Sequence, residues 1–402
     1  MAPAAPLRLV LYTGKGGVGK TTTAAATAVC AAERGLRTGI VSADAAHSLG
    51  DVLECEVGPE LRELAPNLVA VEIDARVEMA RHWGRIRDYL VSLFRYQGIE
   101  DVVAEELALL PGAEELTTLL AVEALAASGD FDFVVVDCAP TDSTLRLLTL
   151  PDVARGTLRV LLKLQQALSA LITPLARSVV PVPLPDSAVF RDAETLLYKR
   201  LRQLRRRITA ARTSVRIVVT PERMVIDESR RAFTDLCLFD VPCDAVVMNR
   251  LLPDAVAEEE FFRDWFRIQE ERTREVAEYF APLHLLRAPL QDDEVTGLER
   301  LADHGRGLFA EVEPDAVLCS APRVRFARSA AGYRAHLPLP GACADDLDVA
   351  VVEDELVVRA GGRRRALLLP HRMASLQVSG ARLRDGELVV SFAGSPGADA
   401  EG

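Results

Sequence analysis

The feature that most constrains the fold of this chain is a glycine-rich segment near its start. Residues 14–22 read Gly-Lys-Gly-Gly-Val-Gly-Lys-Thr-Thr, between an apolar run at residues 7–12 and an alanine-rich stretch at residues 22–33. A strand, a glycine loop and a helix in this order form the context in which G-x-x-x-x-G-K-T binds phosphate. Glycines let the backbone wrap an anion that the helix N-terminus attracts. The segment predicts a nucleotide-binding α/β domain.

Side chains of this loop have separable expected roles. Lys20 supplies a point charge for the β- and γ-phosphates, and the Thr21 hydroxyl is a ligand for Mg²⁺. The chain has 47 basic residues, of which only Lys15, Lys20, Lys163 and Lys199 are lysines, so a pair within one loop indicates chemistry that arginine cannot replace. The expected phosphate site consists of Gly14, Lys15, Gly16, Gly17, Val18, Gly19, Lys20, Thr21 and Thr22.

A carboxylate follows a later apolar run, because residues 133–136 are Phe-Val-Val-Val and lead to Asp137. An acid that ends a strand is usually a turn or cap residue, but beside a P-loop it can hold Mg²⁺ through water. We therefore expect Thr21 and Asp137 to form the Mg²⁺ site.

Short β-branched segments alternate with helical stretches over most of the chain. Strands are expected at residues 7–12, 38–42, 69–73, 131–136, 215–220, 245–248 and 284–286. This alternation is typical of an α/β fold with a doubly wound, mostly parallel sheet. The domain is predicted to span residues 1–315, with helical insertions at about residues 76–127 and 152–212.

The pattern changes near residues 311–322. Short alternating segments then appear at residues 333–339, 347–352, 356–358, 366–369 and 387–392, separated by glycine turns. They predict an all-β sandwich domain over residues 323–394 and a flexible tail at residues 395–402.

Composition excludes several classes of protein. The net charge of −12 argues against a nucleic-acid partner, because phosphate affinity needs a positive surface. Seven scattered cysteines indicate a reducing cytoplasm rather than a disulfide framework. The start has no secretory signal pattern, and the most apolar stretch, residues 158–184, is interrupted by charges. We expect a soluble cytoplasmic protein that is not itself transmembrane.

Three ordered motifs resemble one family of deviant P-loop ATPases. Lys15 matches the additional lysine of its Walker A motif. Residues 44–51, Asp-Ala-Ala-His-Ser-Leu-Gly-Asp, resemble its switch I, D-P-A-H-S-L-S-D, and residues 137–146, Asp-Cys-Ala-Pro-Thr-Asp-Ser-Thr-Leu-Arg, resemble its switch II, D-T-A-P-T-G-H-T-L-R. This family contains ArsA and the ATPase that guides tail-anchored proteins to membranes. The resemblance covers roughly residues 7–305.

The resemblance implies ATP and Mg²⁺ as cofactors, and a homodimer in which Lys15 reaches the partner's nucleotide. It implies that Asp44 orients the attacking water beside Lys20, and that Asn249 and Pro289 lie against the adenine. From the residues alone, the less favoured alternative is that Asn249 is a simple turn residue and Pro289 a strand terminator. The chain has one P-loop where ArsA has two, which again favours a homodimer.

Some positions depart from the family pattern. Ala45 replaces a proline, and Asp142 and Ser143 replace Gly-His in switch II. The C-x-x-C motif that holds zinc in many of the targeting ATPases is missing from residues 258–280, so no zinc is expected. Residues 381–388, Ala-x-Leu-x-Asp-Gly-x-Leu, resemble an element of α-crystallin domains, although any sandwich hairpin can show that pattern. A subgroup of the family carries such a C-terminal domain.

The favoured function is an ATP-switched chaperone or targeting factor with a hydrophobic protein client, which allows a membrane-associated receptor. Apolar positions of the helical insertions would form its groove, although ordinary core helices have the same periodicity. The groove candidates are Met79, Trp83, Ile86, Leu90, Leu161, Leu168, Leu171 and Ile172.

Two alternatives stay open. An arsenite or oxyanion pump ATPase would need cysteines brought together for a soft metalloid. A ParA/MinD-like partitioning ATPase would use the basic run at residues 199–207, which with this net charge is more simply a solvated helix face.

Overall fold

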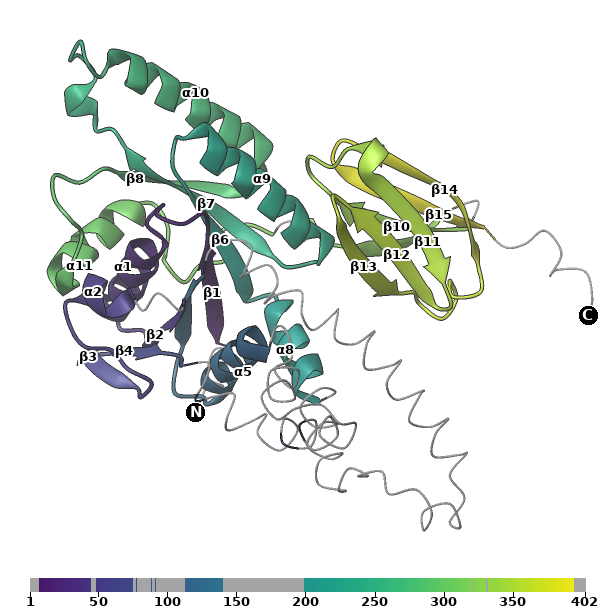
Figure 1. Ribbon diagram of the computed structural model, residues 1–402, viewed down its shortest axis with the longest axis horizontal. Helices are drawn as coiled ribbons and strands as arrows, with labels where there is room; N and C mark the ends of the chain where they lie inside the picture. The colour runs from purple at the N-terminus through teal and green to yellow at the C-terminus, as the bar shows by residue number, and fades with distance from the viewer. Residues whose placement is uncertain are drawn as a thin grey trace, which may run out of the picture.

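The computed structural model describes residues 7–44, 48–74, 113–139, 199–320, 322–329 and 332–393, together with positions 77, 88 and 91 (Figure 1). The eight groove candidates lie outside these residues, as do residues 45–47 of switch I and residues 140–146 of switch II. The phosphate loop, the end of β5 and the C-terminal strands lie within them.

The central element is an eight-stranded sheet in the order β3-β4-β2-β5-β1-β6-β7-β8. Its strands are β1 (Arg8–Thr13), β2 (Thr38–Ala43), β3 (Arg62–Ala65), β4 (Leu68–Glu72), β5 (Phe133–Cys138), β6 (Thr213–Val219), β7 (Cys243–Leu251) and β8 (His284–Pro289). All neighbours pair parallel except β3 and β4. The predicted doubly wound, mostly parallel sheet is confirmed. The sequence patterns did not predict β3, because this short edge strand is largely exposed and lacks an apolar run.

Helices cover both faces of this sheet (Figure 1). They are α1 (Lys20–Glu33), α2 (Leu49–Leu53), α5 (Ala113–Ala127), α8 (Leu201–Ile208), α9 (Arg223–Leu238), α10 (Arg263–Tyr279) and α11 (Gly297–Leu308). Helix α1 contacts α11 and the strands β1, β2 and β5, while α8 and α9 contact β6. Most of α1 is buried, and its small alanine side chains allow this close packing against the sheet.

The C-terminal part is entirely β and contains two antiparallel sheets, β14-β15-β10-β9 and β11-β12-β13. Its strands are β9 (Arg325–Ser329), β10 (Gly332–Pro338), β11 (Leu347–Val352), β12 (Glu355–Ala360), β13 (Arg363–Leu368), β14 (Gln377–Arg384) and β15 (Glu387–Ala393). The first sheet buries Leu337, Leu388 and Val390, and the second buries Leu356 and Val358. The predicted all-β fold is confirmed. Strands β9 and β14 were not predicted, because their residues are exposed or only partly buried and show no buried periodicity.

A cluster of charges lies near the amino-terminal ends of β1 and β7. Arg8, Arg216 and Asp244 are all fully buried. Arg8 Nη2 is 2.7 Å and Arg216 Nε is 3.3 Å from the two oxygens of Asp244. Both guanidinium groups also donate to the carbonyl oxygen of Ala316, each at 3.1 Å, and the Leu318 N–H donates to Asp244 at 3.2 Å. This Arg8–Asp244–Arg216 cluster therefore attaches the segment after α11 to the sheet.

Candidate functional site

The predicted site residues that the structure describes all lie at or near the carboxyl ends of strands. The phosphate loop comes after β1, Asp44 after β2 and Asp137 near the end of β5, while Asn249 and Pro289 lie near the ends of β7 and β8. The carboxyl ends of parallel strands meet at one edge of the sheet, where open α/β folds bind ligands. The fold therefore brings together residues that are up to 275 positions apart, from Gly14 to Pro289 (289 − 14).

The phosphate loop passes directly into α1. Gly19 is the N-cap residue, with φ 89°, and it offers no side-chain acceptor to the first N–H groups of the helix. A β-carbon on Gly19 would lie 2.4 Å from Nδ2 of Asn249, so only glycine fits here. That same Nδ2 donates to the Val18 carbonyl oxygen at 2.8 Å. The arrangement leaves a helix N-terminus that can bind an anion, and Asn249 braces the loop from β7.

The two lysines of the loop point to different places. Lys20 is buried, and its Nζ donates to the Lys15 carbonyl oxygen at 3.4 Å, within the loop. The Lys15 side chain is about one-third exposed, and its Nζ lies 3.9 Å from Oε2 of Glu228 on α9. The loop thus keeps one ammonium group at its own phosphate position and directs the other towards α9.

Asp137 is a buried carboxylate with few partners. Its exposed fraction is 0%, and neither oxygen has a hydrogen bond of normal geometry to the described residues. Burial raises the pKa of Asp137 to about 7, although the nearby Thr21 hydroxyl and Lys20 ammonium lower it, while Asp44 raises it further. A buried carboxylate whose oxygens lack hydrogen bonds and whose pKa is raised is often found at functional sites.

The end of switch I lies next to this carboxylate. Strands β2 and β5 are neighbours in register, with Ser42 opposite Asp137. Asp44 follows β2, is partly buried, and its N–H lies 3.4 Å from the Ser42 hydroxyl. Ser48, which precedes α2, has its hydroxyl 3.1 Å from that of Thr21. Two carboxylates and two hydroxyls from three segments therefore surround the position beside Lys20.

Asn249 and Pro289 lie on adjacent strands, since β7 pairs with β8 and Leu251 lies opposite Pro289. Asn249 is buried, and its Oδ1 accepts from the Arg250 N–H at 2.9 Å. Its amide nitrogen donates to the Val18 carbonyl oxygen. Pro289 is exposed. Their contact with adenine remains a prediction, whereas bracing the phosphate loop is a role of Asn249 that sequence reasoning missed.

Two further residues were not identified from the sequence. Ser48 belongs to the segment that resembles switch I, but nothing in that segment indicated a contact with Thr21. Glu228 lies 213 positions after Lys15 (228 − 15), in a helix with no distinguishing pattern, so no local signal connects the two. Only the packing of α9 beside the loop brings them together.

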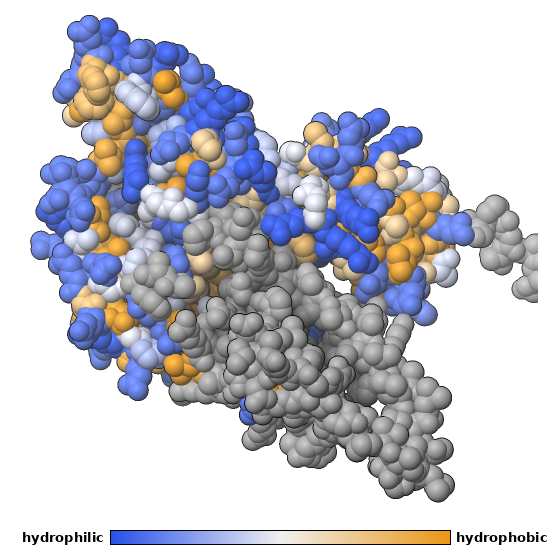
Figure 2. Space-filling view, in the orientation of Figure 1, coloured by the Kyte–Doolittle hydropathy of each residue, from blue (hydrophilic) through white to orange (hydrophobic). Residues whose placement is uncertain are grey.

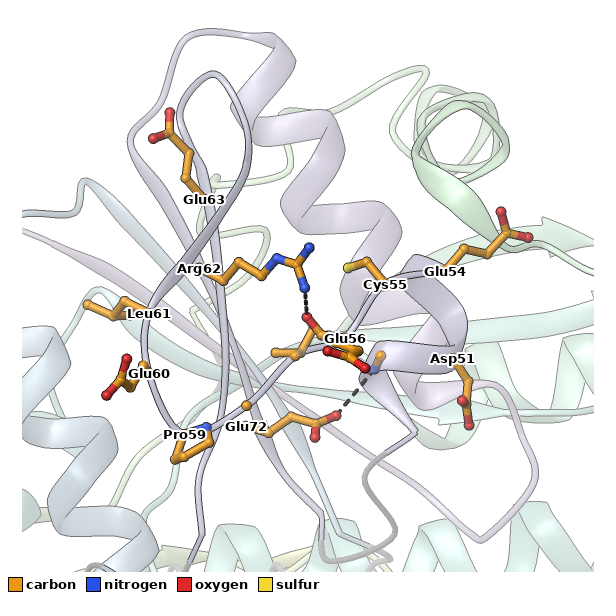
Figure 3. Close-up of a pocket in the computed structure, with 13 residues that line it drawn as sticks. Asp51, Glu54, Cys55, Glu56, Pro59, Glu60, Leu61, Arg62, Glu63 and Glu72 are labelled. Atoms are coloured by element: carbon orange, nitrogen blue, oxygen red, sulfur yellow. Dashed lines mark hydrogen bonds between the residues drawn. The ribbon is translucent and has the colours of Figure 1, made fainter.

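A large cavity among the described residues does not coincide with the phosphate loop. It has a volume of about 1240 Å³, lies beside α2 and β3, and is open to solvent (Figure 3). Six acidic residues line it, and neither Lys15 nor Lys20 does. These are Asp51, Glu54, Glu56, Glu60, Glu63 and Glu72. Such a lining repels phosphate groups, so this cavity is not the nucleotide site.

Comparison with known proteins identifies the family. Residues 7–309 match the family described as anion-transporting ATPase, ArsA, and residues 330–392 match an HSP20-like domain found in ArsA. The ranges agree with the resemblance that the motifs indicated. Within the described residues, no helix is both long and apolar enough to cross a membrane.

Relatives extend along nearly the whole chain. "Putative arsenical pump-driving ATPase 1" of Aquifex aeolicus is 33% identical over 396 residues, covering 96% of this chain and 99% of its own. A protein of Chlorobaculum tepidum named "Putative arsenical pump-driving ATPase" is 32% identical over 391 residues, covering 96% of each chain. "ATPase ARSA2" of Chlamydomonas reinhardtii is 28% identical over 309 residues, covering 73% of this chain and 82% of its own. The chain therefore belongs to the ArsA family of anion-transporting ATPases, in the group with a C-terminal HSP20-like domain, and is an ATP hydrolase.

Proposed function

We propose that this ATPase works as a homodimer that uses ATP hydrolysis to switch its hold on a hydrophobic protein client, as a chaperone or membrane-protein targeting factor. The observation that supports the dimer is that the two lysines of the loop point to different places. Lys20 is buried at its own phosphate loop, whereas Lys15 points outward to Glu228. An ammonium group placed at the rim of one site is positioned to serve the site of a second chain.

The hydrolysis is assigned to residues at the carboxyl edge of the sheet. Lys20 and the first N–H groups of α1 hold the β- and γ-phosphates, and Asp44 orients the water that attacks the γ-phosphorus. The bond from that phosphorus to the bridging oxygen breaks, leaving ADP and phosphate. Lys15 of the partner subunit stabilises the charge that develops on the transferred group. Asn249 and Pro289 lie against the adenine.

The donors around Asp137 fit Mg²⁺. Hydroxyl and carboxylate oxygens are the ligands that this ion prefers, and Asp137 is a buried carboxylate that a cation would neutralise. Thr21 would bind the ion directly and Asp137 through water. An Mg²⁺ ion held there would neutralise part of the negative charge of the nucleotide phosphates.

Support for a hydrophobic client comes from the sequence of the insertions and from the HSP20-like domain. The described surface is mainly hydrophilic in the view of Figure 2, with exposed aromatic side chains at Phe261 (77%) and Trp265 (59%) near the start of α10. A groove able to hold an apolar helix would be larger than this patch. We therefore assign the groove to the insertions, at Leu168, Leu171 and their neighbours.

Trapping and complementation test the ATPase cycle. Asp44→Asn should bind ATP normally and lose turnover about 10²–10³-fold, the size typical for loss of one group that acts in the transition state. Lys15→Ala should also lose turnover, and mixing the two variants should restore part of it, because one site of the mixed dimer keeps both residues. No recovery on mixing at concentrations where dimers form would contradict action across the dimer.

Client binding has its own test. Leu168→Ser with Leu171→Ser should abolish ATP-dependent retention of an apolar helical peptide and leave the melting temperature unchanged. If these leucines were core residues, each change would cost about 2–5 kcal/mol and the melting temperature would collapse. Peptide retention that is equal with and without ATP would refute the switch.

The names of the relatives favour a second candidate, an ATPase that drives an arsenical pump. Arsenite binds best to thiolates. Burial raises the pKa of Cys237 to about 12, and burial also raises that of Cys243, so these thiols stay protonated at neutral pH. Arsenite-stimulated ATP hydrolysis would support this candidate, and hydrolysis that arsenite leaves unchanged would support the client switch.

A further inference from the structure

Helix α9 lies between the phosphate loop and the C-terminal β-domain. In its N-terminal half, Glu228 is the ion-pair partner of Lys15, at 3.9 Å. Both side chains are about one-third exposed, so the pair is partly solvated. In Figure 1 the other end of the helix lies next to the β-domain. One helix therefore contacts the lysine proposed to act across the dimer and the domain that distinguishes this group of ATPases.

The β-domain makes polar contacts with the C-terminal half of α9. Arg363 Nε on β13 is 3.3 Å from an Asp235 oxygen. Arg365, also on β13 and only 5% exposed, donates to the carbonyl oxygen of Leu238, the last residue of the helix. A guanidinium group at this position satisfies a helix-end carbonyl and suits the negative end of the helix dipole.

The loop after β10 adds a close backbone approach. The Pro340 carbonyl oxygen accepts hydrogen bonds from Thr234 of α9 and, at 3.3 Å, from the Tyr279 hydroxyl of α10. Gly341 follows with φ 70°, and a β-carbon there would lie 2.0 Å from the Tyr279 oxygen. Only glycine fits, so the β-domain and the two helices are closely fitted at this point.

We propose that α9 couples the β-domain to Lys15: Glu228 holds Lys15 on its own subunit, and the β-domain holds the helix that carries Glu228. Glu228 is then a positioning residue, and the β-domain regulates how readily Lys15 is released to a partner. The inference rests on the proposed action of Lys15 across a homodimer.

The Lys15–Glu228 ion pair is weak enough to be broken when a nucleotide binds. Ion pairs with this exposure are weak, and a nucleotide triphosphate offers Lys15 several negative charges at once. Lys15 can therefore leave Glu228 when a partner's nucleotide comes within reach. Until then the pair competes with dimer formation, so it raises the protein concentration that full activity requires.

The test follows turnover per chain against protein concentration with saturating Mg·ATP. Glu228→Gln should lower the concentration for half-maximal turnover by about two- to fivefold per released pair, with the plateau and the melting temperature unchanged. Asp227→Asn is the matched control, because it removes the same charge one position away, where the carboxylate faces Arg223 and Arg230. The control should have the same midpoint, that is, the same protein concentration for half-maximal turnover, as the wild type.

A second pair of variants tests the role of the β-domain. Arg365→Met keeps a long side chain but loses the bond to α9, and it should lower the midpoint in the same direction as Glu228→Gln. Arg364→Met changes the neighbouring exposed arginine of the same strand and should have no effect. Combined with Glu228→Gln, Arg365→Met should produce no additional shift, because the contact that it weakens is already absent.

The outcomes separate this inference from the proposed function. Wild-type turnover that does not depend on concentration from the monomer range upward would remove the dimer and Lys15 in trans. If the wild type shows that dependence, equal midpoints for Glu228→Gln and Asp227→Asn would overturn the inference alone. A full additional shift from Arg365→Met in the Glu228→Gln background would overturn the coupling through α9.

Discussion

Asp137 near the carboxyl end of β5 and Asp244 near the amino end of β7 are both buried in the central sheet, and their surroundings are opposite. Both have no exposed surface. Asp244 is bound by two guanidinium groups and the Leu318 N–H, with distances of 2.7, 3.3 and 3.2 Å. Asp137 has no hydrogen bond of normal geometry to the described residues, and burial raises its pKa to about 7.

The difference teaches how to distinguish a structural charge from a functional one. A buried charge is tolerated when partners compensate its desolvation, as in the Arg8–Asp244–Arg216 cluster. At Asp137 the compensation is weaker, because Thr21 and Lys20 lie nearby but neither carboxylate oxygen has a hydrogen bond of normal geometry to the described residues. Burial alone therefore does not identify a site, whereas a buried carboxylate with incomplete compensation marks a candidate.

Removing the compensated carboxylate should have the largest effect on stability. Asp244→Ala leaves two buried guanidinium groups without an anion and should lower the free energy of unfolding by about 3–5 kcal/mol. Urea denaturation measures the loss, with Asp348→Ala, an exposed ion-pair partner of Arg359, as control. A loss below 1 kcal/mol would contradict the view that Asp244, unlike Asp137, is a structural charge.

Neutralising Asp137 in the absence of Mg²⁺ should raise the free energy of unfolding at high pH, whereas Asp244→Ala lowers it. Its pKa rises from 3.8 to about 7 on folding, so the folded state holds the proton more tightly. Stability is then lost as pH rises from about 4 to about 7, by up to roughly 4 kcal/mol at 1.36 kcal/mol per pKa unit. Asp137→Asn should lack this slope and be more stable than the wild type at pH 8 in EDTA. Parallel pH profiles for the two proteins would contradict it.

The segment after α11 should matter because it completes the cluster. The test uses two truncated chains that lack the β-domain, one ending at Val312 and one ending at Ser320. The shorter chain loses the Ala316 carbonyl oxygen and the Leu318 N–H that Arg8, Arg216 and Asp244 use. It should be less stable by about 2–4 kcal/mol, since buried groups lose their partners. Equal denaturation midpoints would place the ATPase boundary before Val312.

The smallest effect should come from the brace on the phosphate loop. Asn249→Ala removes the donor to the Val18 carbonyl oxygen and should cost about 1–3 kcal/mol of stability. The loosened loop should also raise the KM for ATP, by about tenfold if 1.4 kcal/mol of binding is lost. Steady-state kinetics and urea denaturation measure both. An unchanged KM with lowered stability would show that the brace serves the fold alone.

Local features were sufficient for much of this protein. The glycine loop between an apolar run and alanines predicted β1, the loop and α1, and the alternation of segments predicted the mostly parallel sheet. The turn at Asp385 and Gly386 marked a hairpin, which the structure forms between β14 and β15. Strands β3, β9 and β14 escaped prediction because their residues are mostly exposed and show no buried periodicity.

The sequence by itself determined the fold class, the family and the residues of the phosphate loop, because these depend on spacing within short segments. Tertiary structure alone decided which charges are compensated. Arg8, Arg216 and Asp244 meet across 236 positions (244 − 8), and Lys15 meets Glu228 across 213 (228 − 15). A pKa shift and an ion pair depend on distance and on the exclusion of water, and neither arises until the chain has folded.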